Sequence, residues 1–366
     1  MAKSIKNRTP RQDGFWMPAE FEQQEKIWMI WPERSDNWRL GGKPAQKAFK
    51  DVAEVISKYA HVTMCVSEGQ YDNAREVLNE SIRVIEMSSD DAWMRDCGPA
   101  FVKNELGEIR GVHFGFNAWG GLVDGLYFPW NKDQKIPTKI CEVEGVLEYD
   151  ATNFVLEGGS FNVDGQGTLI TTEQCLLSEG RNPHLNKAEI TEYLSAYLGV
   201  EKVIWLPLGI DPEETNGHVD DVCAFARPGE VVIAWTDDEN HPYYHVYKQA
   251  YNVLKNETDA KGRKFKIHKV PLAYPGYLTK EEAEGVDEGD AISRREGDEY
   301  APSYMNYLTV NGGIICPQFG IEQDKDAIRA LEKIYPDYDV VGVMTKEIIF
   351  GGGNIHCITQ QQPKSK

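Results

Sequence analysis

A thiol, an imidazole and three carboxylates in this chain of 366 residues have the types and contexts that chemistry at a planar cation requires. A thiol can attack a guanidinium carbon when paired carboxylates hold the cation and a proton reaches the departing nitrogen. Cys357 is the candidate nucleophile. His218 is the candidate acid and base, with Glu157 as the group that orients it. Asp96 and Asp220 are the carboxylates that would hold the cation.

The sequence before Cys357 supports its selection. Residues 340–350 are largely apolar and predict a buried strand, which Gly351, Gly352 and Gly353 follow directly. Glycines let the main chain approach a ligand closely or adopt positive φ angles. A single cysteine is more often a small buried hydrophobe than a nucleophile. The glycines and the polar residues elsewhere favour the nucleophile here.

Each candidate also has a simpler interpretation when it is taken alone. His218 and Asp220 have the spacing of a metal-binding pair, but no third ligand lies at metal-binding spacing. His356 is expected to point away from the side to which Cys357 points. Glu157, followed by two glycines, is also typical of a turn. No phosphate-binding loop or dinucleotide-binding glycine pattern follows a predicted strand. The sequence therefore predicts neither a metal nor a cofactor.

Composition limits the classes of partner. Lys plus Arg number 39 and Asp plus Glu 58, for a net charge of −19, which argues against a nucleic-acid surface. An acidic cleft attracts small cations, although the same acidity also keeps a protein in solution. No apolar run is long enough to span a bilayer, and residues 1–11 lack the apolar core of a secretory signal. Seven scattered cysteines without a C-x-x-C pair indicate a reducing compartment, so we expect a cytoplasmic protein.

The candidate residues precede recurring hairpins. Polar segments lead into strand pairs whose turns contain Gly107, Gly165, Gly229 and Gly312, and helices are expected near 187–198, 244–254 and 324–334. Residues 351–357 and the N-terminal strands near 26–31 and 62–66, with a helix over 44–59, complete a fifth unit. Units of one hairpin and one helix that recur along the chain predict a radial repeat. We expect one α/β domain over residues 1–366. A closed ring would bring Asp96, Glu157, His218 and Cys357 to one end of its axis.

Residues 273–300 depart from this pattern. They are rich in Gly and Glu and contain Arg294 and Arg295, which predicts a long surface loop. Such a loop is either a passive insertion or a lid over the axial site.

The motifs resemble, in this order along the chain, those of the agmatine deiminase family. They are Trp28–Pro32, Trp93–Pro99, Asn117–Gly121, Glu157–Ser160, Thr215–Asp221 and Gly351–Cys357. The resemblance implies a pentein fold, a five-bladed α/β propeller with pseudo-fivefold symmetry and ββαβ-type repeats. It also implies hydrolysis of agmatine through a covalent amidino-cysteine, a place in polyamine metabolism, no cofactor, and a homo-oligomer, either a dimer or a tetramer.

Carried over by position, the family's nucleophile falls on Cys357, its catalytic histidine on His218 and the partner of that histidine on Glu157. The guanidinium-binding carboxylates fall on Asp96 and Asp220. The expected substrate-binding residues are Trp93, Trp119, Glu214 and Gly352, with Glu213 as a second acidic neighbour of the distal ammonium. Alternatives within the fold are an arginine or peptidyl-arginine deiminase or an amidinotransferase, and outside enzymes a non-catalytic binding scaffold.

Overall fold

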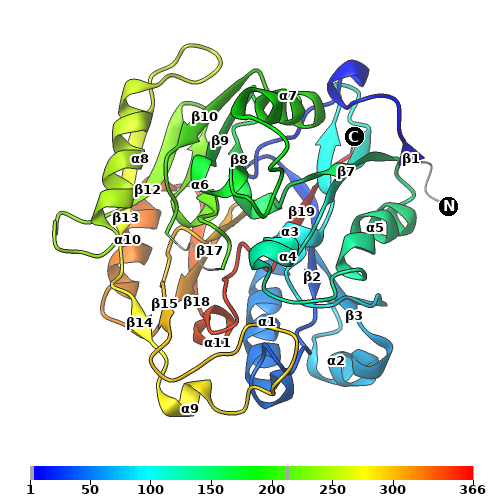
Figure 1. Cartoon of the computed structure of the whole chain (residues 1–366), viewed down its shortest axis with the longest axis vertical. Coiled ribbons are helices and arrows are strands. Elements are labelled where there is room, and N and C mark those ends of the chain that lie inside the picture. Colours follow the sequence, from blue (N-terminus) through cyan, green and yellow to red (C-terminus); the bar gives the residue numbers. More distant parts are fainter. Residues whose placement is uncertain (1–3, 211–213, 366) are drawn as a thin grey trace.

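Five sheets of one strand plan form the frame of the protein. The computed structural model describes residues 4–210 and 214–365 and shows a mixed α/β fold. In each sheet an antiparallel strand pair is followed by a helix and a third strand that is parallel to its neighbour. Figure 1 shows α1, α5, α7 and α8 toward the outside of the molecule and the strands toward its centre.

The units have the following bounds. The first contains β5 (Ala100–Lys103), β6 (Ile109–Gly115), α5 (Ile136–Glu144) and β7 (Glu148–Val155). The second contains β8 (Phe161–Val163), β9 (Thr168–Thr172), α7 (Lys187–Leu198) and β10 (Lys202–Leu206). The third contains β11 (Cys223–Arg227), β12 (Glu230–Trp235), α8 (Tyr244–Asn256) and β13 (Lys266–Pro271). The fourth contains β16 (Leu308–Val310), β17 (Gly313–Gln318), α10 (Asp324–Ile334) and β18 (Asp339–Met344). The fifth contains β19 (Gln360–Pro363), β2 (Gln24–Ile30), α1 (Lys43–Ile56) and β3 (His61–Val66).

Shorter elements extend or connect the units. Strand β1 (Ser4–Ile5) pairs with β7, and β4 (Arg83–Glu86) pairs with β3. The remaining α-helices are α2 (Tyr71–Val77), α3 (Met94–Cys97), α4 (Gly121–Asp124), α6 (Glu173–Leu176), α9 (Lys280–Ala283) and α11 (Lys346–Ile349). The 3-10 helices are η1 (Arg11–Asp13), η2 (Leu40–Gly42), η3 (Glu68–Gln70), η4 (Asp133–Lys135), η5 (Gly158–Ser160) and η6 (Val219–Asp221).

The predicted hairpins are confirmed, and their glycines explain the turns. Gly107, Gly165, Gly229 and Gly312 have φ angles of 80°, 68°, 76° and 85°, in the left-handed region that favours glycine. The predicted helices are also present. In α1 the residues at helical spacing are buried against the core, as its apolar pattern predicts.

The prediction of a buried strand over residues 340–350 is wrong in its second half. Strand β18 ends at Met344, lies at the edge of its sheet and is largely not buried. At Thr345 the backbone N–H bonds to the carbonyl of Gln318, and the chain then forms α11 before it reaches the glycines. A short apolar run does not distinguish strand from buried helix, so periodicity could not locate this change.

The C-terminal strand closes the fifth sheet directly after Cys357. Strand β19 pairs antiparallel with β2, and the indole Nε1 of Trp28 donates to Oε1 of Gln362 at 2.8 Å. The other end of that amide donates to Glu144 at 2.9 Å. In Figure 1 the red C-terminal segment accordingly lies beside blue β2 near the middle of the molecule. The position of Cys357 is therefore fixed by pairing between segments from the two ends of the sequence.

Residues 273–300 fold back over the molecule with little regular structure. Strands β14 (Gly276–Tyr277) and β15 (Glu299–Tyr300) pair with each other, and α9 lies between them. The loop is attached by an isolated bridge from Ala291 to Tyr127 and by the bond of Leu40 N–H to the carbonyl of Gly285. The expectation of a surface segment is confirmed.

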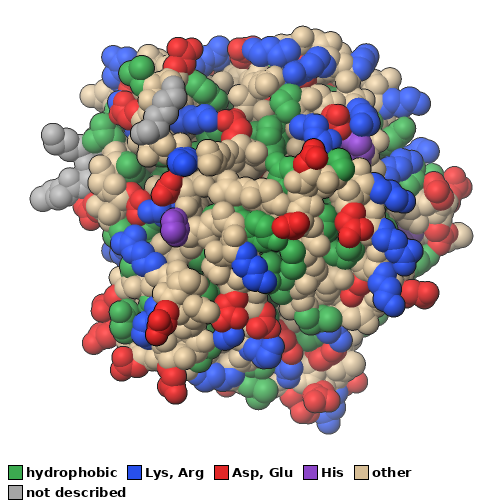
Figure 2. Space-filling model, turned by 180° about the vertical axis from the view of Figure 1, so that it is seen from behind, with side chains coloured by type: hydrophobic (Ala, Val, Ile, Leu, Met, Phe, Trp, Pro, Cys, Tyr) green, Lys and Arg blue, Asp and Glu red, His purple; other side chains and the backbone are tan. Residues whose placement is uncertain are grey.

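On the face shown in Figure 2, basic and acidic side chains are interspersed, with hydrophobic side chains in small groups between them. Among the described residues, none of the helices combines the length and apolar composition that crossing a membrane requires.

Removal of the Gln362 amide should lower stability. The change Gln362→Met leaves the buried indole N–H of Trp28 without its acceptor, and an orphaned buried donor costs about 1–3 kcal/mol. Urea unfolding of both proteins would measure the difference. Gln360→Met in the same strand is the control, because Oε1 of Gln360 is buried without a hydrogen-bond partner. Equal losses in the two variants would contradict the assigned role of Gln362.

Candidate active site

Three of the predicted residues close in on the buried Gly159. A Cβ atom at this glycine would lie 2.5 Å from Nδ1 of His218, 2.9 Å from Oδ2 of Asp220 and 3.1 Å from Oδ1 of Asp96. Any side chain here would therefore collide with all three groups. Because only glycine lets these groups approach one another so closely, Gly159 belongs to the site although the sequence identified it only as part of a turn.

Asp96, on α3, is held by neutral donors. Its Oδ1 accepts the backbone N–H of Gly159 at 2.8 Å, and its Oδ2 accepts the indole N–H of Trp119 at 2.9 Å. Burial raises the pKa of this carboxyl, and the charge of the nearby His218 offsets only part of that rise. An ionised carboxylate has about four lone-pair positions, so Asp96 keeps acceptor capacity for a cation.

Asp220, on η6, has a different partner. Its Oδ2 lies 2.8 Å from Nδ1 of His356, and its Oδ1 is buried without a hydrogen-bond partner. The other ring nitrogen of His356 lies 2.9 Å from Oε2 of Glu20. Burial raises the pKa of Asp220, but His356 lowers it more, and the net shift is downward. His356 does point away from the thiol of Cys357, as expected, but toward a carboxylate of the site.

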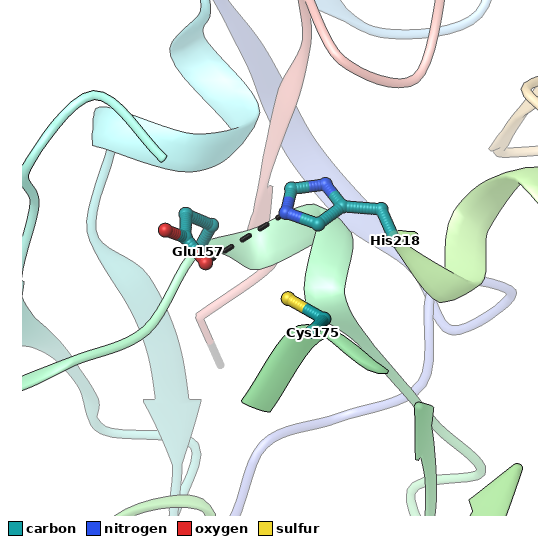
Figure 3. Close-up of side chains that lie close together, drawn as sticks. All are labelled: Glu157, Cys175 and His218. Carbon is teal, nitrogen blue, oxygen red and sulfur yellow. Dashed lines mark ion pairs between the residues drawn. The ribbon is translucent and has the colours of Figure 1, made fainter. Parts of the chain in front are cut away.

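His218 points toward Glu157, and a dashed line marks this ion pair in Figure 3. Its Nε2 is 3.7 Å from Oε2 of Glu157, and neither of its ring nitrogens has a hydrogen-bond partner. Burial opposes its charged form, but Asp96 and other neighbours raise the pKa of His218 well above its ordinary value. The Nδ1 lies beside Gly159, whereas Nε2 is the nitrogen nearer Glu157.

Glu157 is shared between two cations. Its Oε1 lies 2.7 Å from Nε of Arg181, and both side chains are fully buried. Burial alone would raise the pKa of Glu157, but Arg181 and His218 lower it to about 2. Arg181 also donates to the carbonyl of Trp119 and, at 2.7 Å, to the side-chain oxygen of Asn216. No sequence pattern identifies this arginine, because it lies between the strands and helices that periodicity identifies.

The thiol of Cys357 lies beside Asp220 and Asn306. Its Sγ is 3.8 Å from Oδ2 of Asp220 and 3.3 Å from the amide nitrogen of Asn306. The amide oxygen of Asn306 accepts the backbone N–H groups of His356 and Cys357, which fixes the turn that carries the thiol. Burial and the carboxylates of Asp220, Asp221 and Asp96 raise the pKa of Cys357 well above its ordinary value. Both causes favour the protonated thiol over the thiolate.

Trp93 and Gly353 pack closely beside the thiol. A Cβ at Gly353 would lie 2.5 Å from the Trp93 ring and 3.1 Å from Sγ of Cys357. The ring is fixed by its bond to Asp91 at 2.9 Å and by edge-on packing against Trp119. Both tryptophans are buried, and Trp119 serves the site as a donor to Asp96 in addition to packing.

A pocket opens beside Gly352 and Gly353. Its lining includes Glu214, Asp221, Arg294, Asp298, Gly352 and Asn354. Arg294, from the 273–300 loop, pairs with Glu214 and donates to the carbonyl of Gly351 at 2.8 Å. Glu214 and Gly352 thus lie together at the mouth of this pocket, and their role in substrate binding stays a prediction. Glu213 lies outside the described residues.

One group of side chains has metal-binding atom types. Single donor atoms of Glu157, Cys175 and His218 lie within 4.8 Å of one another. Figure 3 shows these three side chains. The guanidinium of Arg181 already pairs with Glu157, and the raised pKa of His218 means that a proton occupies the histidine. Both charges oppose a metal ion, so this arrangement is better suited to holding a proton.

Comparisons with known proteins agree with this geometry. The profile of the Porphyromonas-type peptidyl-arginine deiminase family matches residues 16–363. The solved agmatine deiminase of Enterococcus faecalis is 55% identical, with a TM-score of 0.97 over 99% of this chain and 100% of that one. A Streptococcus mutans protein provisionally named agmatine deiminase is 56% identical over 99% of this chain and 100% of its own length.

The chain belongs to the agmatine deiminase family. A solved agmatine deiminase of C. jejuni shares the fold at 23% identity, with a TM-score of 0.82 over 96% of this chain and 97% of that one.

In this member of the agmatine deiminase family the carboxylates should control the reactivity of Cys357. Asp220→Asn removes a negative charge next to the thiol, so we expect its pKa to fall and its alkylation by iodoacetamide at pH 8 to accelerate, about tenfold for each unit of the fall. Peptide mass spectrometry would follow Cys357 among the seven cysteines. Asp326→Asn, on the surface of α10, should leave the rate unchanged; an unchanged rate in Asp220→Asn as well would show that burial alone suppresses the thiolate.

Proposed function

We propose that this protein hydrolyses agmatine to N-carbamoylputrescine and ammonia through a covalent amidino-cysteine. One observation supports this most directly. Two carboxylates, Asp96 and Asp220, meet a buried imidazole at Gly159, and a buried thiol lies 3.8 Å from Asp220. The relatives that share more than half of this sequence are named for the same reaction.

The guanidinium would bind between Asp96 and Asp220. Each carboxylate can accept N–H groups from one side of the planar cation, and such charge-assisted bonds are the strong ones. The open Oδ1 of Asp220 provides one acceptor without the loss of an existing bond. Bound in this way, the central carbon lies near Sγ of Cys357.

Binding of the cation also activates the thiol. The same carboxylates that raise the pKa of Cys357 are neutralised by the guanidinium, so the pKa falls and the thiolate forms. The nucleophile therefore becomes reactive only when its target is present.

In the first half of the reaction the sulfur of Cys357 bonds to the guanidinium carbon. His218 gives the proton of its Nδ1 to the departing nitrogen, the C–N bond breaks, and ammonia leaves a thiouronium on the sulfur. Glu157 stabilises the imidazolium of His218 before this transfer and keeps the ring in the same orientation while the proton moves.

In the second half His218, now neutral, takes a proton from water. The oxygen adds to the thiouronium carbon, the C–S bond breaks, and the carbamoyl product leaves with the thiol restored. Atoms and charge balance as the agmatine cation plus water giving N-carbamoylputrescine plus ammonium. His218 gives one proton to the departing nitrogen and regains it from water, and the hydroxyl proton of the adduct restores the thiol. The proton that the thiol first releases to solvent is the one that converts ammonia to ammonium.

The mouth favours a substrate with a distal cation. Glu214, Asp221, Asp298 and Glu299 line it together with Arg294. Since Arg294 pairs with Glu214, the loop arginine reaches the mouth but is neutralised there. An arginine substrate would bring an α-carboxylate into this acidic surface, whereas agmatine brings an ammonium.

We further propose that the five units are the blades of one pentein propeller domain, since all five share the plan of hairpin, helix and parallel strand. We also propose a cytoplasmic homo-oligomer, in keeping with seven free cysteines. The intact set of Cys357, His218, Glu157, Asp96 and Asp220 argues against a non-catalytic scaffold.

Replacement of the nucleophile tests the reaction. Cys357→Ala should abolish release of ammonia from agmatine and leave circular dichroism unchanged. Acid quenching of the wild-type reaction should show an adduct on the peptide that contains Cys357, and not on other cysteine peptides. Cys65→Ala, a change of another buried cysteine, should keep activity. Turnover by Cys357→Ala would disprove the covalent route.

Side-by-side kinetics test the substrate. We expect kcat/KM for agmatine to exceed that for arginine at least about tenfold, because an unpaired carboxylate costs about 1–3 kcal/mol or more and 1.4 kcal/mol corresponds to a factor of ten. Arg294→Ala should not lower the activity on arginine further. A different result would be equal use of both substrates by the wild type, with activity on arginine lost in Arg294→Ala. That result would show that Arg294 selects the substrate.

A further inference from the structure

His356 lies between two carboxylates that come from distant parts of the chain. Nδ1 lies 2.8 Å from Oδ2 of Asp220, and Nε2 lies 2.9 Å from Oε2 of Glu20. The side chains of His356, Asp220 and Glu20 are 5%, 3% and 11% exposed. An ionised carboxylate can only accept, so a hydrogen bond on each side requires an N–H on each ring nitrogen. A ring with both N–H groups is an imidazolium.

The other charged groups around this ring leave that balance in place. Arg95, on α3, donates through Nε to the backbone carbonyl of His356 at 3.2 Å and opposes the charge of the ring. The same arginine donates to Gln361 at 2.6 Å. His218 is close enough to Asp220 to lower the pKa of that carboxyl. Tyr307 is close enough to Glu20 for the carboxylate to raise the pKa of the tyrosine. Two carboxylates in direct contact outweigh one arginine bonded to the backbone.

We infer that His356 is a positioning residue: a permanently charged imidazolium that, held by Glu20, keeps Asp220 ionised and turns its free Oδ1 toward the guanidinium. The catalytic part of this inference rests on the proposed function. The charge of His356 is independent of that function.

The contrast between the two substrate carboxylates supports this role. Asp96 is bound only by neutral donors, whereas Asp220 has a cation on one oxygen and an open second oxygen. Burial opposes the charge of Glu20 and of Asp220, yet the pKa of each is lowered by His356, and the pKa of His356 is raised by both. Loss of this cation would let Asp220 take up a proton and cease to attract the substrate.

Nuclear magnetic resonance of protein with ¹⁵N-labelled histidine tests the charge directly. Among the eight histidines, His356 is assigned from the signal that His356→Gln removes. At pH 8, where an ordinary histidine is neutral, both ring nitrogens of His356 should show the shifts of an imidazolium. A neutral ring in wild-type protein at pH 8 would overturn the inference whatever the activity.

Glu20→Gln tests the role in catalysis. Glutamine has the same shape but a single acceptor oxygen, so it can accept from the backbone N–H of Thr309 or from Nε2–H of His356, not from both, and it lacks the charge. The pKa of His356 should fall, so kcat/KM for agmatine should be within about threefold of wild type at pH 6 and at least about tenfold lower at pH 8.5, since one pKa unit changes the protonated fraction by up to a factor of ten.

Glu22→Gln is the matched control. Glu22 lies in the same segment and pairs with Lys103, away from the site. Its pH profile should equal that of wild type. A uniform loss in Glu20→Gln at all pH values, or identical profiles in the two variants, would show that Glu20 has only a structural role. If wild-type protein fails to hydrolyse agmatine, the proposed function fails, while the resonance measurement still decides the charge of His356.

Discussion

Buried charge is the constraint on which this structure depends. Around Gly159, four carboxylates meet four cationic side chains, namely Glu20, Asp96, Glu157 and Asp220 with Arg95, Arg181, His218 and His356. A buried charge without a partner costs several kcal/mol, so such a set is stable only when it is nearly neutral. In the proposed reaction, a guanidinium that enters adds one positive charge to this set, and loss of the thiol proton restores the balance. Under that proposal, substrate binding and activation of the nucleophile are one electrostatic event.

Local sequence predicted those parts that local physics determines. Glycines marked the hairpin turns, apolar spacing marked α1, α7, α8 and α10, and the order of the motifs brought Asp96, Glu157, His218 and Cys357 together. Arg181, Asn306 and Glu20 escaped because their partners are distant in sequence and none lies in a periodic pattern. His356 was assigned no role because it was expected to point away from the site. Residues 355–358 form a turn, in which neighbouring side chains do not alternate as they do in a strand, and its ring reaches Asp220.

Backbone strain near Asp96 is another feature that no sequence pattern predicts. Ala118 and Trp119 have φ angles of 53° and 65°, a conformation that costs non-glycine residues of order 1–3 kcal/mol. Arg181 donates to the carbonyl of Trp119 and holds this bend. The bend directs the indole N–H to Asp96 at 2.9 Å. Arg181 therefore contacts two parts of the site. It pairs with Glu157, the neighbour of His218, and it donates to Trp119, whose indole N–H bonds to Asp96.

The pairing of β19 with β2 has a consequence for how the protein folds. Trp28 and Gln362 are 334 residues apart, so their contact closes nearly the longest loop that this chain can form. Contacts of such high sequence separation form slowly, because the entropy of loop closure must be overcome before the contact contributes. The acidic residues of the inner units can gather earlier, but the thiol joins them only when the two ends meet. Recovery of activity during refolding accordingly reports on completion of the whole chain, and a nascent chain that still lacks β19 has carboxylates without a positioned nucleophile.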